Sequence, residues 1–343
     1  MIEKNNKNIK VAVLGATGLI GQMFVYLLDR HPWFNIELLT ASESRSGGYY
    51  SNEVKWSLPF SLPESTRSIV LSELKIENII SKDIKIVFSA LPSEIASGFE
   101  REMREQGLFV FSNSGSHRLK GDVPILIPEA NPGSLEMIKN QGYPGKGFIV
   151  TNANCSTTGL AVTLAPLRKF GIREIYVSTY QSISGAGLSG LSAFDITGNA
   201  IPFIEGEEKK MVMELRKIFR EHPSIYPHCV RIPVLFGHLE TIWVRFDKKV
   251  CPDDIRDSWE SFRFDKTELP SQPELPVSYF EEPLFPQHRQ VFSGSPSGMQ
   301  VFTGQLKKSD DMIGFSLLVN NLIRGGAGGS IQNAELFCNR YGG

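Results

Sequence analysis

The segment from residue 9 to residue 28 constrains the fold more than any other part of this sequence. The apolar run Ile9-Lys-Val-Ala-Val-Leu14 predicts a buried strand, and glycines follow it at once. Leu19 to Leu28 then has the apolar spacing of a helix that packs on one face. A strand, a glycine turn and a helix in direct succession are typical of the first unit of a parallel sheet covered by helices.

Strands and helices continue to alternate along the first half of the chain. Apolar runs at 36–41, 84–91 and 108–111 predict three more strands. Between the last two, Ser93 to Gln106 predicts an amphipathic helix closed by Gly107. This alternation predicts an α/β fold with a Rossmann-type doubly wound parallel sheet.

The pattern changes after the apolar run 148–151, and a second domain of mixed α+β structure is expected to begin near Cys155. Longer strand-like stretches appear there, at 174–181, 239–246 and 299–306. Residues 315–341 again have a helical pattern, interrupted by a glycine-rich stretch at 324–330. We expect this last segment to return to the first domain. The predicted division is therefore 1–154 plus 325–343 for the dinucleotide-binding domain and 155–324 for the second domain.

Composition narrows the functional class. A chain of 343 residues with 41% hydrophobic residues can bury two cores. The formal net charge of −1 argues against nucleic acid as a partner. The sequence has no uncharged apolar run of about 18 residues, so we expect no membrane span and a cytoplasmic location. Four cysteines without C-x-x-C pairs indicate neither a disulfide framework nor a metal site.

The glycine turn is a candidate cofactor site. In Gly15-Ala-Thr-Gly18-Leu-Ile-Gly21, residues without Cβ let the backbone approach a pyrophosphate, and the following helix offers free N–H groups. The candidate contacts are the glycines with Thr17, Leu19 and Ile20. The spacing G-x-x-G-x-x-G departs from the usual G-x-G-x-x-G, and the alternative is a tight turn that binds nothing.

The end of the second strand bears on the choice of cofactor. Ser42, Arg45 and Ser46 suit a 2′-phosphate, which favours NADP. Glu43 is the objection, because a carboxylate there can bind the ribose of NAD. Arg45 on a solvated loop without a ligand is the other alternative.

Cys155 is the candidate nucleophile. It follows a strand and precedes the apolar run 160–170, which places it near a helix N-terminus, where we expect the thiol pKa to be lowered. The alternative is an unreactive core cysteine. Arg231 and His238 lie close together in the sequence and provide a candidate carboxylate clamp and proton exchanger.

Taken in order, the motifs of this chain resemble those of the aspartate-semialdehyde dehydrogenase family, in its archaeal and fungal branch. The resemblance covers nearly the whole chain and rests on these segments: 15–21, 112–118, 128–132, 152–157, 181–187, 201–210, 231–238 and 321–335.

The resemblance implies roles for particular residues. Cys155 would be the nucleophile, His238 the acid/base, Gln181 the residue that orients the intermediate, and Arg231 the binder of the substrate carboxylate. The substrate amino group would meet Glu207, or Glu208 if the alignment slips by one residue. Two further sets are implied by the resemblance: Arg118, Lys210 and Asn154 for the phosphate, and Asn113 and Asn321 for the cofactor.

The reaction implied is the NADPH-dependent reductive dephosphorylation of 4-phospho-L-aspartate to its semialdehyde through a thioester on Cys155. The family also implies a homodimer or a dimer of dimers formed through the second domain. Two departures bear on the pocket and the cofactor: Leu188-Ser-Gly-Leu191 replaces an expected aromatic and proline, and Gly47-Gly-Tyr49 replaces the usual Ala-Gly-Lys.

Three alternatives stay open at this point. Malonyl-CoA reductase would use the same cysteine, histidine and arginine, but its substrate has no amino group for Glu207 to bind. N-acetyl-glutamyl-phosphate reductase matches the segments less well. An inactive regulatory Rossmann protein would be expected to have lost at least one of Cys155, His238, Gln181 and Arg231, and all four are present.

Overall fold

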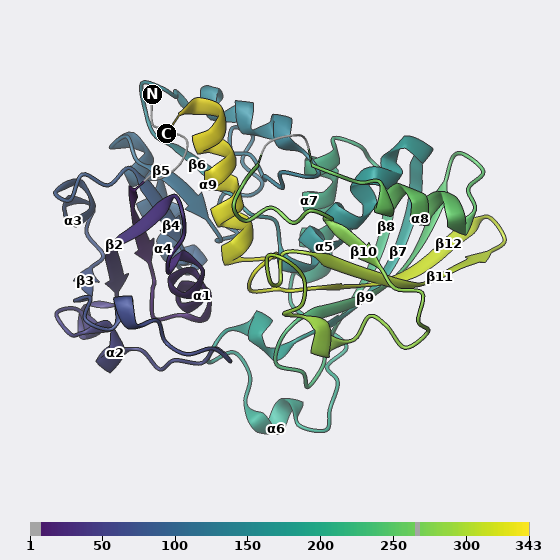
Figure 1. The fold of residues 1–343 in the computed structure, drawn as a ribbon, viewed down its shortest axis with the longest axis horizontal. Helices are drawn as coiled ribbons and strands as arrows, with labels where there is room; N and C mark the ends of the chain where they lie inside the picture. The colour runs from purple at the N-terminus through teal and green to yellow at the C-terminus, as the bar shows by residue number, and fades with distance from the viewer. Residues whose placement is uncertain (1–7, 265–267, 343) are drawn as a thin grey trace.

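The computed structural model describes residues 8–264 and 268–342, which form two lobes, each built around a six-stranded sheet (Figure 1). The strands of the first sheet pair in the order β3-β2-β1-β4-β5-β6 and all neighbours are parallel. This order places β1 beside β4, at the point where the winding of the chain reverses. The strands are β1 (Ile9–Leu14), β2 (Phe34–Ala41), β3 (Ser72–Glu73), β4 (Ile86–Ser89), β5 (Phe109–Ser112) and β6 (Phe148–Thr151).

Helices cover both faces of the first sheet, because successive residues of a strand point to opposite sides. Val11 and Val13 of β1 pack in one cluster with residues of α1 and α9, whereas Ala12 and Leu14 pack with α3 and α4. The predicted doubly wound fold is therefore confirmed. The helices are α1 (Leu19–Leu28), α2 (Tyr50–Glu53), α3 (Ile76–Ile80), α4 (Ser93–Glu105) and α9 (Ala327–Tyr341).

The second sheet is mixed, with the order β10-β11-β12-β9-β7-β8. One of its faces is covered by α5, α7 and α8, whose apolar residues share a core with the strands. The strands are β7 (Ile172–Gln181), β8 (Ser224–Arg231), β9 (His238–Phe246), β10 (Val277–Tyr279), β11 (Val301–Ser309) and β12 (Met312–Val319). The helices are α5 (Cys155–Leu164), α6 (Ala193–Ile196), α7 (Glu207–Phe219) and α8 (Pro252–Glu260).

The helical prediction for residues 315–341 is wrong in its first part. Residues 315–319 belong to β12, which lies between β11 and β9, and α9 begins at Ala327, inside the stretch taken as an interruption. A fully buried central strand and a buried helix both appear as an apolar run, so periodicity did not separate them. The glycines serve close packing: a Cβ on Gly328 would lie 2.7 Å from Met299 Sδ.

Helix α9 returns to the first lobe and packs against α1 (Figure 1). Arg324, which precedes it, is buried, and its guanidinium is bonded to Glu129 and to Gln332 of α9. The predicted boundaries, 1–154 plus 325–343 and 155–324, stay a prediction, and residues 1–7, 265–267 and 343 lie outside the described part of the chain. Within the described part, no helix is long and apolar enough to cross a membrane.

Candidate active site

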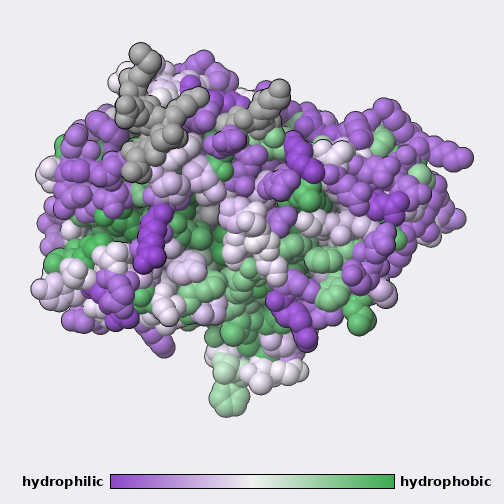
Figure 2. Space-filling model, in the orientation of Figure 1, coloured by the Kyte–Doolittle hydropathy of each residue, from purple (hydrophilic) through white to green (hydrophobic). Residues whose placement is uncertain are grey.

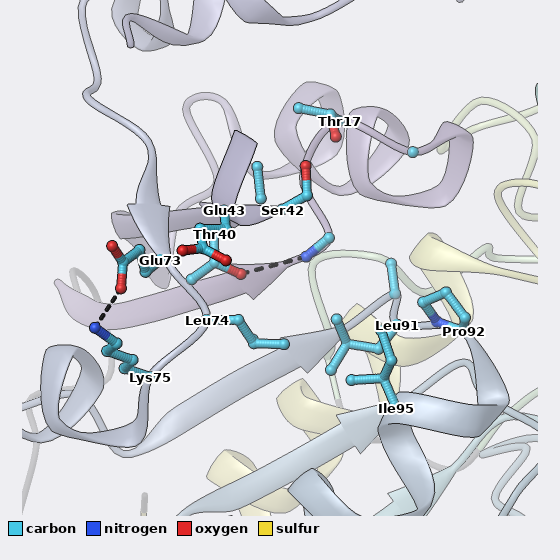
Figure 3. A pocket seen from close by; sticks show the side chains of 14 residues that line it. Thr17, Thr40, Ser42, Glu43, Glu73, Leu74, Lys75, Leu91, Pro92 and Ile95 are labelled. Carbon is cyan, nitrogen blue, oxygen red and sulfur yellow. Dashed lines mark hydrogen bonds and ion pairs between the residues drawn. The ribbon is translucent and has the colours of Figure 1, made fainter. Parts of the chain in front are cut away.

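A cavity of about 670 Å³ lies at the carboxyl ends of β1, β2 and β4, where the winding of the first sheet reverses (Figure 3). This is the place where open α/β sheets bind ligands. Gly15, Thr17 and Gly18 of the glycine turn line it. The opposite wall is apolar and includes Leu91, Pro92 and Ile95.

The glycines of the turn have different structural duties. Gly15 has φ +70° and a Cβ there would lie 2.9 Å from the Ala90 carbonyl oxygen, so only glycine fits. A Cβ on Gly21 would lie 2.1 Å from the Gly15 carbonyl oxygen, so this residue allows α1 to pack against the turn. Leu19 is buried, and neither it, Ile20 nor Gly21 lines the cavity.

The start of α1 is open for a ligand. Gly18 is its N-cap, and among the described residues no side chain caps this end of the helix. The first N–H groups of the helix and the positive end of its dipole therefore lie next to Gly18, which lines the cavity, and this suits a pyrophosphate. A dinucleotide fits this turn and this cavity.

At the end of the cavity next to β2, the structure separates residues that the sequence grouped together. Ser42 and Glu43 line the cavity, whereas Arg45 and Ser46 do not, and Arg45 is exposed. Lys75 also lines it, where its ammonium is paired with Glu73 (Figure 3). Sequence reasoning missed Lys75, because it follows β3, a strand of two residues that no periodicity can reveal.

Cys155 is the first residue of α5. Asn154 is the N-cap, and its side-chain oxygen accepts hydrogen bonds from the N–H groups of Ser156 and Thr157. The predicted position at a helix N-terminus is confirmed.

Three neighbouring strands of the second sheet bring Arg231, Gln181 and His238 into one row. Gln181 at the end of β7 is paired with Arg231 at the end of β8 and with His238 at the start of β9. The row faces Cys155: His238 Nε2 lies 3.0 Å from Cys155 Sγ. Residues distant in the sequence thus meet through strand register alone.

The orientation of His238 is set by the turn that follows β7. The backbone N–H of Ser182 donates to Nδ1 at 3.1 Å. Because Nδ1 accepts this bond, the proton of the neutral ring lies on Nε2 and points toward Cys155. Ser182 belongs to the motif 181–187, but no role of its own was predicted for it from the sequence.

The expectation of a lowered thiol pKa is wrong for this structure. Burial, with a smaller contribution from Glu207, raises the pKa of Cys155 to about 12, whereas Arg118 and Arg231 act to lower it. Burial also lowers the pKa of His238, to about 3. A helix N-terminus favours the thiolate, but the loss of water around a small anion outweighs that effect here.

Arg231 is held in place by the turn that follows β7. Its Nη1 donates to the Ser182 carbonyl oxygen at 2.7 Å, and its side chain is buried. A Cβ on Gly185 would lie 2.7 Å from the same nitrogen and 3.2 Å from His238 Cε1. The turn 182–185 therefore packs directly on the arginine and the histidine.

Helix α7 contributes the acidic residue. Glu207, its first residue, accepts a bond from Asn154 Nδ2 at 2.8 Å and lies 3.4 Å from Gln181 Nε2. Lys210 pairs with the other oxygen of Glu207 at 3.1 Å. Glu208 instead accepts from the backbone N–H of Cys229, so Glu207 and not Glu208 contacts the residues around Cys155.

The remaining predicted residues lie around this centre. Arg118 donates to Glu214 and to the Asn113 carbonyl oxygen. The Asn113 side chain bonds to Asn152 and Ser330. Asn321 does not line the cavity: its Oδ1 accepts from the Gly237 N–H at 2.8 Å, next to His238.

The two halves of the site meet at the segment before α9. A Cβ on Gly325 would lie 2.7 Å from Cys155 Cβ, and one on Gly326 would lie 2.9 Å from Ile20 Cδ1 in the first turn of α1. The cysteine and the glycine turn are therefore separated only by two glycines of this segment.

Comparison with known families covers both lobes. Residues 10–138 match the family "Semialdehyde dehydrogenase, NAD binding domain", and residues 164–324 match "Semialdehyde dehydrogenase, dimerisation domain". The match to a dimerisation domain indicates that the chain forms oligomers.

Relatives match over nearly their whole length. The aspartate-semialdehyde dehydrogenase of Archaeoglobus fulgidus is 40% identical over 95% of this chain and 97% of the relative. That of Saccharomyces cerevisiae is 36% identical over 96% and 97%. A protein named malonyl CoA reductase (NADP) from Metallosphaera sedula is 34% identical over 96% and 97%.

The fold is shared with a solved structure of the same kind. Aspartate-semialdehyde dehydrogenase from Candida albicans, solved with NADP, superimposes with a TM-score of 0.88 at 32% identity, over 97% of this chain and 99% of that chain. With near-complete coverage by archaeal and fungal relatives and a common two-lobed fold, this chain belongs to the aspartate-semialdehyde dehydrogenase family.

Proposed function

We propose that this protein catalyses the NADPH-dependent reductive dephosphorylation of 4-phospho-L-aspartate to L-aspartate 4-semialdehyde. The contact of 3.0 Å between Cys155 Sγ and His238 Nε2, beside Gln181 and Arg231, carries the proposal. A thiol, a proton donor and a carboxylate-binding arginine in one place are what an acyl transfer to cysteine requires.

Cys155 supplies the nucleophile. Its thiolate attacks the acyl carbon, a C–S bond forms, and the C–O bond to phosphate breaks. Arg118 and Arg231 favour the thiolate, since both lower the pKa of Cys155. The Nε2–H of His238 is placed to donate a hydrogen bond to the sulfur.

His238 stabilises the oxygen of the acyl group during its reduction. When bound, NADPH supplies the hydride that reduces the thioester. The Nε2–H of His238 is placed to donate a hydrogen bond to the oxyanion that develops on this reduction, and collapse of the oxyanion breaks the C–S bond, releases the aldehyde and returns the thiolate of Cys155. The lowered pKa of His238 makes its protonated form a strong acid, so a neutral ring is the resting state.

Substrate contacts follow from the charges around this pair. Arg231 binds the α-carboxylate through its planar fork, and Glu207 binds the ammonium group. Arg118 and Lys210, with Asn154, bind the phosphate, which needs positive charge and N–H donors. Gln181 orients the carbonyl of the thioester.

An assay of the purified protein separates this reaction from its alternative. With semialdehyde, phosphate and NADP, we expect NADPH formation that depends on phosphate; with malonyl-CoA and NADPH, we expect no consumption above background. The relative named malonyl CoA reductase is the reason for the second arm. Turnover of malonyl-CoA without phosphate-dependent turnover of the semialdehyde would reverse the assignment.

NADP is the cofactor, in keeping with the open N-terminus of α1 and the cavity beside it. Comparison of kcat/KM for NADP and NAD tests this choice. We expect NADP to be preferred. Arg45→Ala, on the exposed loop after β2, should reduce the preference, and Lys75→Ala, which removes a cation that lines the cavity, is the comparison. A preference for NAD would mean that Glu43 binds the ribose.

The oligomer is proposed to be a homodimer or a dimer of dimers that uses the uncovered face of the second sheet. Tyr226, Tyr176 and Trp243 lie in one row across that face, and the two tyrosine rings are stacked at 4.7 Å. Both tyrosines are exposed, which is typical of an interface residue before association. Measurement of the molar mass by light scattering distinguishes the two assemblies.

The segment that carries α6 extends away from the second lobe and supports the same proposal (Figure 1). Its tip is coloured as apolar in Figure 2, and Phe194 in α6 is 100% exposed. A cytoplasmic location is also proposed, because Cys155, Cys229 and Cys251 are free thiols rather than disulfides.

A further inference from the structure

Helix α7 carries a second buried carboxylate, Glu214, that the reaction described above does not use. It lies seven residues after Glu207, which is two helical turns along the same face. Its side chain is only 2% exposed. A carboxylate in this position needs partners that donate hydrogen bonds.

Both oxygens of Glu214 have such a partner, and each partner belongs to the active site. Oε1 accepts from Arg118 Nη1 at 3.1 Å, and Oε2 accepts from the backbone N–H of Asn154 at 2.6 Å. Asn154 is the residue before Cys155 and the N-cap of its helix. One carboxylate therefore joins the proposed phosphate-binding arginine to the backbone at the nucleophile.

We propose that Glu214 is a positioning residue that fixes the distance between Arg118 and Cys155, so that the phosphate of the substrate and its acyl carbon meet their partners together. Glu214 touches neither substrate nor cofactor in this role. The inference rests on the proposed function, in which Arg118 binds phosphate and Cys155 attacks the acyl carbon.

Neighbouring contacts show that this arrangement is supported from both sides. Arg118 also donates to the Asn113 carbonyl oxygen at 2.9 Å. Lys217, one turn after Glu214, donates to the Arg118 carbonyl oxygen at 2.6 Å and to those of Lys120 and Val123. Helix α7 thus holds both the side chain and the backbone of Arg118.

The chemistry of the two partners explains why a carboxylate is needed. Both Arg118 Nη1 and the Asn154 N–H are donors, so the residue between them must accept at both positions. Glutamine has one acceptor oxygen, and its NH₂ group would face a donor on the other side. Glu214→Gln keeps the size of the side chain but breaks one of the two bonds.

The test measures steady-state kinetics in the phosphate-consuming direction, with semialdehyde, phosphate and NADP. For Glu214→Gln we expect the KM for phosphate to rise about tenfold or more and kcat to fall, because a charge-assisted bond is lost and the geometry relaxes. The KM for NADP should stay within twofold. Glu221→Gln is the matched control, since Glu221 pairs with Arg168 at 2.6 Å away from the site and should leave all constants unchanged.

A double-mutant cycle with Arg118→Gln tests the coupling. If Glu214 acts through Arg118, the double variant should have a phosphate KM close to that of Arg118→Gln alone. Independent, multiplicative effects of the two substitutions would overturn the proposal, as would a phosphate KM within twofold of wild type in folded Glu214→Gln. Should Glu214→Gln fail to fold, Glu214→Asp keeps both acceptors on a shorter side chain, and the same rise in phosphate KM is expected; a wild-type value refutes the proposal.

A second measurement does not depend on the substrate assignment. Alkylation of Cys155 by iodoacetamide reports thiolate content, which Arg118 increases. In Glu214→Gln we expect the alkylation rate of Cys155 at neutral pH to change several-fold and its pH profile to shift, because Arg118 is no longer held in place, while the exposed Cys251 is unaffected. An unchanged alkylation rate of Cys155 overturns the positioning role. Absence of phosphate-dependent activity in the wild-type protein would instead count against the proposed function, so the two failures are distinguishable.

Discussion

The substitution Gly325→Ala tests how closely the segment before α9 sets the position of the nucleophile. A Cβ at residue 325 would lie 2.7 Å from Cys155 Cβ, 2.8 Å from Cys155 Cα and 3.1 Å from the Cys155 carbonyl oxygen. Carbon atoms in ordinary contact are about 3.5–4.0 Å apart, so the methyl group needs about 1 Å of additional space. Two of the three atoms are backbone, and no side-chain rotation can provide that space.

Displacement of Cys155 changes its contact with His238, on which the reaction depends. Cys155 Sγ and His238 Nε2 are 3.0 Å apart, and a shift of about 1 Å takes them out of hydrogen-bond range. A misplacement of this size lowers rates about a hundredfold, which is about 2.7 kcal/mol of activation free energy. Overpacking should also lower the free energy of unfolding by about 1–3 kcal/mol.

The assay is kcat for NADPH formation, together with the affinity for NADP and the alkylation rate of Cys155. We expect kcat to fall about a hundredfold while the NADP affinity stays within twofold, because the glycine turn is not displaced. Gly98→Ala in α4 is the control: its Cβ would meet no atom within 4 Å, so turnover should not change. Wild-type turnover and stability in Gly325→Ala would refute the reasoning, because they would mean that a methyl group fits at residue 325 without displacing Cys155.

Three further outcomes are expected. Cys155→Ser should abolish turnover and leave NADP binding unchanged, because a hydroxyl is a far weaker nucleophile than a thiolate; turnover within tenfold of wild type would exclude the thioester. Arg231→Lys should lower kcat/KM about ten- to a hundredfold by losing both the fork and the bond to the Ser182 carbonyl oxygen, and an analogue without the carboxylate should be affected less. Burial raises the pKa of Glu100 to about 7. The free energy of unfolding of the wild type should therefore decrease by up to about 3 kcal/mol as pH rises from 4.5 through 7, whereas that of Glu100→Gln should not show this decrease. Chemical denaturation measures both free energies, and parallel pH curves would contradict the prediction.

Local features of the sequence predicted the parts of the molecule that depend on near neighbours in the chain. The strand at 9–14 and the helix at 19–28 were identified with the bounds that the structure has, because apolar period and glycine position act within a few residues. The location of Cys155 at a helix start was also predicted, because the residue follows an apolar strand and precedes the apolar run 160–170. The fold class followed from the alternation of predicted strands and helices, and the family followed from the order of short motifs along the chain.

Other properties were decided by tertiary structure alone. The choice of Glu207 over Glu208 depends on which face of α7 turns toward Asn154, and the row Arg231, Gln181 and His238 depends on the register of three strands. The pKa of Cys155 is raised and not lowered as the sequence predicted, because packing excludes water from the thiol. Neighbouring residues in the sequence do not reveal this exclusion of water. These quantities depend on contacts between residues far apart in sequence and on the exclusion of solvent, which arise only when the two lobes close around the site.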